Sequence, residues 1–320
     1  MGGSADRRHA VRIALAATAA AALLGWGATP ALAAKPSGKK GGGGGSSTPT
    51  GNDISYPQCG GSFPVGSAFG IVGLTGGLAD DLNPCFGPST TYPSYTQSEL
   101  YWAVASTVGG AGQPLASLYV NTADPGNVYN GTVISDWPTS GGNATYGDCT
   151  TTTVTLTSGT YTVGENSDAC AWQYGYNMAS KDAAWLTAAA AAINNQDASA
   201  QVSGWAGSYP WWLDVETANT WQAKTTMNVA DLQGMIAALT AAGASTVGAY
   251  STAYQWDKIT GGTTSASASG SLYGIPDWIP GARTLSGAQS NCTQASFTVG
   301  TVALTQWFSH PFDGDYACAA

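Results

Sequence analysis

The segment WWLDVE, residues 211–216, places two carboxylic acids two positions apart in an apolar stretch. Side chains alternate between the faces of a β-strand, so a strand here would direct Trp212, Asp214 and Glu216 to one face. Two neighbouring acids in a partly dry site do not both ionise readily, and one pKa rises. Hydrolysis of a glycosidic bond needs a protonated acid beside a charged neighbour. We assign the general-acid role to Glu216, which has the longer reach.

Solvated loop acids or a helix-capping pair are the alternative for Asp214 and Glu216, because an Asp-x-Glu pattern often arises by chance. The rest of the composition favours carboxylate chemistry. After residue 33 the only histidine is His310, so His-rich zinc motifs are absent. The sequence also lacks the Gly-x-Ser-x-Gly nucleophile motif and the Gly-rich phosphate loop that ends in Lys-Ser/Thr. Carboxylates are what remains for chemistry, and we expect no metal site.

Residues 1–33 have the features of a cleaved signal peptide. Three arginines precede an alanine-rich apolar run, and Ala31-Leu32-Ala33 forms an A-x-A cleavage site. A retained membrane anchor is the alternative, but the run falls below the roughly 20 apolar residues that a spanning helix needs. Residues 34–51 are rich in Gly, Ser and Lys and predict a flexible linker. We therefore predict secretion, with no membrane attachment after cleavage.

The cysteines and the charge of residues 52–320 agree with export. Six cysteines in an exported chain indicate disulfides, and sequential pairing closes the shortest loops: Cys59–Cys85, Cys149–Cys170 and Cys292–Cys318. This region holds four basic and eighteen acidic residues, a net charge of −14. Such a surface repels nucleic acid and anionic membranes. We expect a monomer whose partner is a neutral polymer such as a polysaccharide.

Apolar β-rich segments alternate with segments of helical period in residues 52–320. This alternation predicts a parallel sheet covered by helices, and the length favours one α/β domain, a (β/α)8 TIM-type barrel, over an open sheet. A Thr-rich insert interrupts the pattern at about 127–170. Asn228 is the predicted N-cap of the third helix and Gly243 its end. The predicted strands are 52–57, 69–77, 115–126, a segment within 209–221, 246–251, 276–280 and 302–308, and the predicted helices are 96–110, 171–195 and 228–243.

Functional residues of a TIM barrel lie where its strands end, at the carboxyl end that we call the mouth. Tyr119 and Asn121, two apart in one predicted strand, would line the mouth; structural hydrogen bonding is the alternative. Tryptophan rings at strand ends could stack on sugars, although large aromatic side chains are more often core. The tryptophans at or near predicted strand ends are Trp212, Trp256, Trp278 and Trp307.

Five motifs in chain order resemble glycoside hydrolase family 25, the secreted muramidases: NDISYPQ (52–58), FGIVGLTGG (69–77), WLDVE (212–216), VGAYST (247–252) and LTQWFSHPFDGD (304–315). Asp53 matches the family's opening acid, and Asp214 with Glu216 match its central Asp-x-Glu. Gln306 and Trp307 resemble its Trp-Gln region. The closing Asp-x-Asp makes Asp313 the fourth mouth acid, or Asp315 if the register shifts. A calcium loop at Asp313 is the alternative, but the other ligand positions are missing.

The resemblance implies cleavage of the β-1,4 bond after N-acetylmuramic acid in peptidoglycan, by a protein that is secreted or associated with the cell wall. It implies that Asp214 orients the acetamido group of the substrate and that no cofactor is needed. The catalytic set is then Glu216, Asp214, Asp53 and Asp313, and the resemblance adds Asp315, Gln306 and Trp307 as substrate-binding residues. Tyr119, Asn121 and Trp212 join the substrate-binding set because of their positions in the predicted strands.

The sequence departs from this family at three features. Thr75-Gly76-Gly77 stands where the family has an acidic Thr-Glu-Gly, and neither the insert nor the disulfides are typical of it. Loops at the mouth determine specificity, so these departures bear on the substrate more than on the fold. Two further hypotheses follow: a barrel domain that binds cell-wall glycan without cleaving it, and a hydrolase of another polysaccharide.

Overall fold

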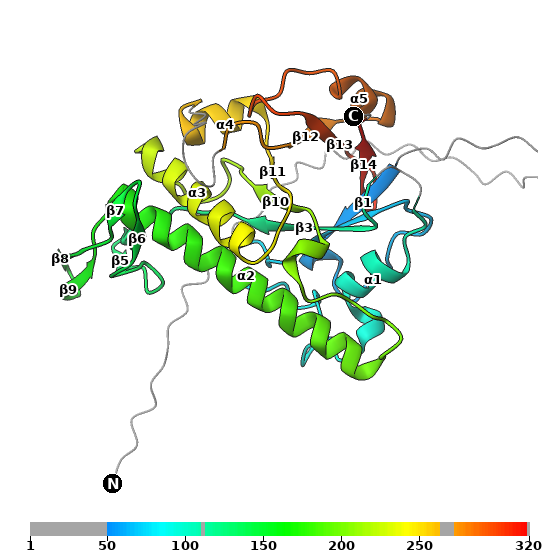
Figure 1. Ribbon diagram of the computed structural model, residues 1–320, viewed down its shortest axis with the longest axis horizontal. Helices are drawn as coiled ribbons and strands as arrows, with labels where there is room; N and C mark the ends of the chain where they lie inside the picture. Colours follow the sequence, from blue (N-terminus) through cyan, green and yellow to red (C-terminus); the bar gives the residue numbers. More distant parts are fainter. Residues whose placement is uncertain (1–49, 110–112, 263–271, 319–320) are drawn as a thin grey trace, which may run out of the picture. The chain divides into compact units, whose positions relative to one another are not determined.

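The computed structural model describes residues 50–109, 113–262 and 272–318 (Figure 1). The predicted signal peptide and most of the predicted linker lie outside these residues. Thr50 and Gly51 do not belong to a linker, because they form the start of the first barrel strand. Within the described residues, no helix is both long and apolar enough to cross a membrane.

Eight strands form a closed barrel in the order β1-β14-β13-β12-β11-β10-β3-β2. Six of the neighbouring pairs are parallel, whereas β14 runs antiparallel to both β1 and β13. The strands are β1 (Thr50–Ile54), β2 (Gly70–Gly73), β3 (Ala116–Asn121), β10 (Trp211–Asp214), β11 (Val247–Tyr250), β12 (Asp277–Ala282), β13 (Val302–Trp307) and β14 (Asp313–Ala317).

The predicted α/β class and closed eight-stranded barrel are confirmed, but the strict (β/α)8 pattern is wrong because the barrel is mixed. The final unit is an antiparallel hairpin, β13–β14. Only residues 308–312 join these strands, too few for the crossover helix that a parallel neighbour requires. The described helices are α1 (Glu99–Ala105), α2 (Asp168–Gln196), α3 (Thr225–Ala241), α4 (Ala253–Thr260) and α5 (Leu285–Asn291), with short 3-10 turns η1 (Tyr56–Gln58), η2 (Tyr95–Gln97) and η3 (Ala206–Ser208).

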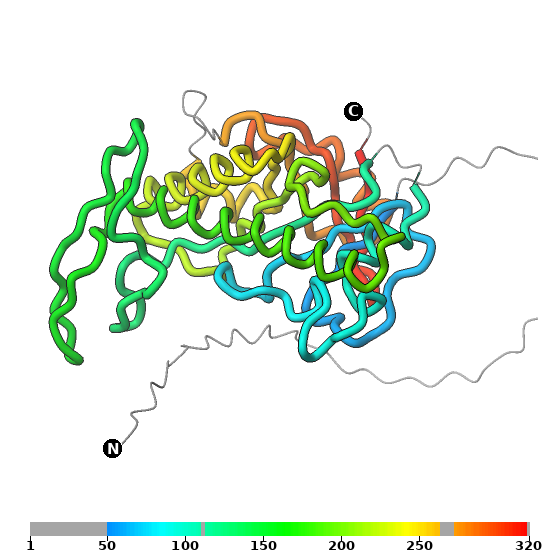
Figure 2. The backbone as a smooth tube through the Cα atoms, turned by 60° about the horizontal axis from the view of Figure 1, so that its bottom comes forward, coloured from blue at the N-terminus to red at the C-terminus, as the bar shows by residue number. Residues whose placement is uncertain are grey.

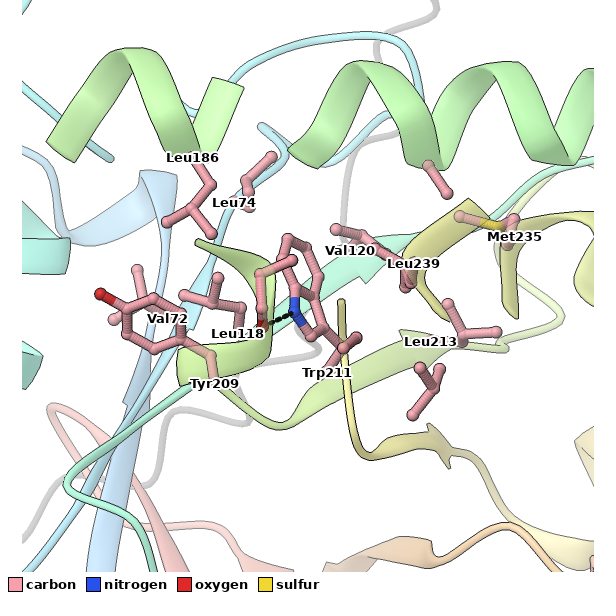
Figure 3. Close-up of a cluster of buried hydrophobic side chains, with 14 of the residues drawn as sticks. Val72, Leu74, Leu118, Val120, Leu186, Tyr209, Trp211, Leu213, Met235 and Leu239 are labelled. Atoms are coloured by element: carbon pink, nitrogen blue, oxygen red, sulfur yellow. Dashed lines mark hydrogen bonds between the residues drawn. The ribbon is translucent and has the colours of Figure 1, made fainter. Parts of the chain in front are cut away.

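The two faces of β10 lie in different cores, as its alternation predicts. Trp211, Leu213 and Val215 pack in the outer core, which includes side chains of α2 and α3 (Figure 3). The Trp211 ring donates through Nε1 to the carbonyl of Ala206 at 3.0 Å. Trp212 instead belongs to a smaller cluster with side chains of β2, β12, β13 and β14. That cluster fills the barrel interior, so the face that carries Trp212 also directs Asp214 inward.

Of the two predicted helix-end residues, one has the predicted place: Gly243, with φ of 102°, follows the end of α3. Ser98 begins α1 by accepting a hydrogen bond from the Tyr101 amide. Asn228 is not an N-cap, because α3 begins at Thr225. Its buried amide instead donates to the carbonyls of Gln222 and Ile259 and thereby fixes the preceding loop against α4.

The insert forms three two-stranded antiparallel sheets between β3 and α2. It ends at residue 167, slightly earlier than predicted, because α2 begins at Asp168. Figure 2 shows it projecting beyond the N-terminal end of α2. The sheets are β4 (Val128–Tyr129) with β5 (Thr132–Val133), β6 (Gly142–Asn143) with β7 (Gly147–Asp148), and β8 (Thr151–Leu156) with β9 (Gly159–Gly164).

All six cysteines pair sequentially, as predicted from the short loops. The disulfides are Cys59–Cys85, Cys149–Cys170 and Cys292–Cys318. The first ties the loop after β1 to the loop after β2, the second ties the insert to α2, and the third ties α5 to the C-terminal end of the barrel. Each closes a loop of about 20 residues or more, for which the chain-entropy relation gives roughly 3 kcal/mol of stabilisation.

Candidate active site

The central acids lie at the carboxyl end of β10. The strand ends at Asp214, so Glu216 follows the strand rather than belonging to it, unlike the prediction. Asp214 is only 7 % exposed and stands in register with Asn121 of β3 and Tyr250 of β11. Glu216 is partly exposed. The pair therefore combines one buried carboxyl group with one that a ligand can reach.

Asn121 fixes the orientation of the Asp214 carboxylate. Its Nδ2 donates to Oδ2 of Asp214 at 2.6 Å. Its Oδ1 accepts from the Gly77 amide at 3.1 Å and from Thr75 Oγ1 at 3.0 Å. The segment that replaces the family's acidic Thr-Glu-Gly thus holds the amide that contacts the central acid. Asn121 was expected at the mouth, but its link to Thr75 and Gly77 carried no sequence signal.

A second chain of hydrogen bonds crosses the barrel from β11 to β1. The Tyr250 hydroxyl donates to Oε1 of Gln306 at 2.9 Å, and Nε2 of Gln306 donates to Oδ2 of Asp53 at 2.9 Å. Asp53 stands in register with Asp313 on the antiparallel neighbour β14. Residues in register across a sheet share a face, so Asp53 and Asp313 point to the same side.

The two acids of the closing motif occupy different depths. Asp315 is fully buried and accepts from Nε1 of Trp278 at 2.9 Å. Asp313 is partly exposed and accepts from the Ser309 amide at 3.3 Å. A substrate at the mouth can reach Asp313 but not Asp315, which lies below it in the barrel. The register therefore favours Asp313 as the fourth mouth acid and removes Asp315 as a direct substrate contact.

Burial and mutual repulsion raise the pKa values of these acids. Burial raises the pKa of Asp214 well above its ordinary value, and the charges of Glu216 and Asp53 add to the rise. Burial also raises the pKa of Glu216, while a hydrogen bond from Gln255 opposes it. The pKa of Asp53 rises to about 6 through burial, against the Gln306 hydrogen bond, and Asp313 contributes repulsion. Burial likewise raises the pKa of Asp313. The carboxyl groups at the mouth therefore stay protonated to higher pH than ordinary carboxyl groups do.

Most of the proposed stacking tryptophans are not available to a ligand. Trp212 and Trp278 are buried against each other in the barrel, with ring centroids 5.9 Å apart, and Trp256 is buried in the outer core. Trp307 lies on the opposite face of β13 from Gln306, and its ring covers Gly314. Tyr119 is partly exposed and makes an edge contact with Trp278 at 6.2 Å. Of these predicted aromatic contacts, Tyr119 alone is both partly exposed and on the inward face of its strand.

Three exposed aromatic side chains that the sequence analysis did not select lie shortly after strands that end at the mouth. Tyr56 follows β1 and is 45 % exposed, Tyr254 follows β11 and is 68 % exposed, and Phe308 follows β13 and is 72 % exposed. β1 and β11 stand opposite each other in the barrel, since four steps of the eight-strand ring separate them. The sequence could have identified these three aromatic residues, because each follows the end of a mouth-directed strand by one to four residues.

A comparison with protein families matches residues 199–273 to the family described as Lysozyme-like protein 1. The matched segment contains β10, Asp214 and Glu216. The chain is thus similar to lysozyme-like proteins over the segment that carries its central acid pair, in agreement with the muramidase resemblance of the sequence. No curated protein matches the chain.

Two solved structures align with most of the chain at low similarity. One is a muramidase from Trichobolus zukalii, with 15 % identity, a TM-score of 0.41, and coverage of 85 % of this chain and 94 % of that chain. The other is the bacterial lysozyme from Streptomyces coelicolor, with 14 % identity, a TM-score of 0.42, and coverage of 85 % and 92 %.

Proposed function

We propose that this protein is a secreted glycoside hydrolase that cleaves the glycan strands of peptidoglycan. The observation that carries the proposal is the gathering of Asp53, Asp214, Glu216 and Asp313 at one end of the barrel, with raised pKa values. Burying acids near one another costs stability, so their retention favours a chemical role. The match to lysozyme-like proteins, which includes Asp214 and Glu216, supports peptidoglycan as the substrate.

Glu216 is the proposed general acid. It is partly exposed, and burial raises its pKa, which favours the protonated form at a position that a substrate can reach. Its carboxyl proton passes to the glycosidic oxygen as the bond from that oxygen to the anomeric carbon breaks. The resulting carboxylate then accepts a proton from the water that completes hydrolysis, which restores the acid.

Asp214 is the proposed orienting group. Asn121 holds Oδ2, while Oδ1 is buried and has no hydrogen-bond partner among the described residues. Oδ1 can accept a hydrogen bond in either protonation state of the carboxyl group. It would accept the acetamido N–H of the substrate, which directs the acetamido oxygen at the anomeric carbon. The acetamido oxygen then bonds to the anomeric carbon as the glycosidic bond breaks, which closes a five-membered ring between the acetamido group and the sugar. Water later attacks the anomeric carbon and opens this new ring. When ionised, Asp53 and Asp313 would supply negative charge near the cationic transition state.

The direct test is to incubate the secreted chain with purified peptidoglycan and measure new reducing ends. We expect hydrolysis by the wild type and a loss of about 100-fold or more in Glu216→Gln, from the usual size of general-acid catalysis. Glu165→Gln is the matched control, because Glu165 is an exposed glutamate of the insert. Unchanged hydrolysis in Glu216→Gln would overturn the assignment of the acid.

A non-catalytic glycan-binding domain is the second candidate. The observation that favours it is the loop Thr75-Gly76-Gly77, which presents an amide and a hydroxyl group to Asn121 where the muramidase family has an acid. Under this alternative, the wild type and Glu216→Gln would both sediment with insoluble peptidoglycan and neither would release reducing ends. Sedimentation and reducing-end assays on the same samples therefore distinguish the two candidates.

Export is part of the proposal. Three disulfides favour an oxidising compartment, because cytosolic thiols are kept reduced. We propose cleavage of the signal peptide after Ala33 and a linker that ends before β1. N-terminal sequencing of the protein from culture medium tests this, with Ala34 as the expected first residue. Recovery of the intact N-terminus in the membrane fraction would contradict it.

A further inference from the structure

The β8–β9 hairpin belongs to the insert, which leaves the barrel at its mouth. The chain leaves β3 at the mouth, forms the insert and enters α2, so the insert replaces a loop at the carboxyl end of β3. Asn121, the last residue of β3, contacts the central acid Asp214. Figures 1 and 2 show the small sheets beside the N-terminal end of α2, away from the barrel core.

The base of the insert is held firmly. Trp137 stacks on Tyr174 of α2 with ring centroids 5.4 Å apart, and the Cys149–Cys170 disulfide lies in the same cluster. Nε1 of Trp137 donates to the Glu165 carbonyl at 3.0 Å. The Tyr146 hydroxyl donates to Gln233 of α3 at 2.8 Å. The hairpin therefore extends from a fixed base, which lowers the entropy lost when it binds a partner.

One face of the hairpin presents a regular set of hydroxyl groups, which we call the threonine face. Along β8, exposed positions alternate with partly buried ones, and every exposed position is a threonine. The register pairs Thr153 with Thr162 and Thr155 with Thr160, which places the threonines of both strands on the same side. Oγ1 of Thr155 and Oγ1 of Thr160 lie 3.3 Å apart. The face comprises Thr151, Thr153, Thr155, Thr160 and Thr162.

The hairpin carries no charge, in contrast to the rest of the domain. Residues 149–164 contain no Asp, Glu, Lys or Arg, whereas residues 52–320 have a net charge of −14. Exposed edge strands usually carry charged residues that prevent pairing with other chains. High β-propensity explains threonine in a strand but not the absence of charge on both edges. The uncharged hairpin does not repel anions. An acidic protein can therefore contact a polymer that itself bears carboxylates through this surface.

We propose that the threonine face docks the sugar units of a peptidoglycan strand and holds the polymer beside the mouth. The proposal rests on the hydrolase function proposed above and names the insert as the second contact for the same substrate. Threonine hydroxyls both donate and accept hydrogen bonds, as sugar hydroxyls and acetamido groups do. The partner is a glycan rather than a protein, since the face offers hydroxyl groups and no apolar anchor of the kind that dominates protein interfaces.

The test compares Thr153→Val/Thr162→Val with the control Thr150→Val/Thr152→Val, in the full secreted chain. Valine keeps the shape and β-propensity of threonine and removes the hydroxyl group. The control changes Thr152, which points to the other face of β8, and Thr150, which precedes the strand. Sedimentation with insoluble peptidoglycan is measured in the Glu216→Gln background, so that binding does not depend on turnover. We expect affinity to fall about five- to tenfold in the test pair only, from the net contribution of two hydrogen bonds.

The outcomes separate this proposal from the hydrolase proposal. Lower affinity in the test pair supports docking whether or not the wild type hydrolyses peptidoglycan. Equal affinity in the test pair, the control pair and the parent overturns docking and leaves the hydrolase proposal intact. Sugar attached covalently to the hairpin threonines, seen as added mass in the intact protein, would also overturn docking, because the hydroxyl groups would then be modification sites. Circular dichroism checks that each variant is folded.

Discussion

Asn121 donates a 2.6 Å hydrogen bond to Asp214 across the β3–β10 ladder, and the same amide accepts from the Thr75 hydroxyl and the Gly77 amide. The loop after β2 is therefore linked to the central acid Asp214 through the side chain of Asn121. Asn121 lowers the pKa of Asp214, against burial and the charge of Glu216, which raise it. The hydrogen bond from Asn121 is thus the contact that opposes protonation of Asp214.

Asn121→Ala should lower kcat/KM for peptidoglycan by about 10- to 100-fold, the usual consequence of losing a hydrogen bond to a charged group. Because the pKa of Asp214 rises further without the amide, the rising limb of the pH–rate profile should move to higher pH. Rates measured across pH 4–8 test this, with Asn177→Ala on α2 as control. A lower rate with an unmoved rising limb would mean that Asn121 supports the structure without influencing Asp214.

Phe308→Ala and Tyr254→Ala should raise KM for peptidoglycan by a few-fold and leave kcat and stability nearly unchanged. Both rings are more than half exposed, so truncation removes little packing, whereas a sugar stacked on either ring would lose contact area. Tyr273→Ala serves as control, because Tyr273 is exposed but precedes β12 at its other end. Identical KM values in all three variants would exclude a sugar-binding role for the two mouth aromatics.

The protein should be more stable at pH 5 than at pH 8. Glu99 is fully buried, accepts from Asn83 at 2.7 Å, and has its pKa raised by burial from 4.5 to about 8. The folded state binds this proton more tightly than the unfolded state, so its stabilising effect is complete below pH 4.5 and is lost as pH rises toward 8. In that window the loss approaches about 1.4 kcal/mol per pH unit for one proton. Burial shifts the pKa of Asp124, to about 7, in the same direction.

Denaturant unfolding at several pH values measures this dependence. Glu99→Gln cannot ionise, so its free energy of unfolding should fall less steeply with pH than that of the wild type. Glu165→Gln, at an exposed position, should retain the wild-type slope. Wild-type stability that is flat or rises from pH 5 to 8 would show that Glu99 is not held protonated in the folded protein.

Gly314→Ala should destabilise the barrel by about 2 kcal/mol or more, in the range for overpacking a filled site. The Trp307 ring lies across Gly314, and a Cβ there would overlap it. Gly287→Ala in α5 is the control, because its Cβ would have ordinary contacts and alanine favours a helix. Thermal unfolding of both variants tests this. Equal melting temperatures would mean that Trp307 moves aside without cost.

The sequence was most informative where one local pattern determined the outcome. Alternation in WWLDVE correctly separated the outer core from the barrel interior, and short loop lengths gave the disulfide pairing. β14 was not predicted as a strand, because Asp313, Gly314 and Asp315 disfavour strands locally. It forms one because both neighbours pair with it, and Trp278 donates a hydrogen bond to Oδ1 of the buried Asp315. The exposure of Phe308 and burial of Trp256 depend on tertiary packing that single-sequence patterns do not contain.

The most direct test of the account is the identity of the sugar ends released from peptidoglycan. After borohydride reduction, mass spectrometry of products from the wild type and from Glu165→Gln should show fragments that end in reduced N-acetylmuramic acid. Glu216→Gln should release almost none. Fragments that end in another sugar would contradict the assigned bond, and fragments of equal yield from Glu216→Gln would contradict the role of Glu216 as the acid.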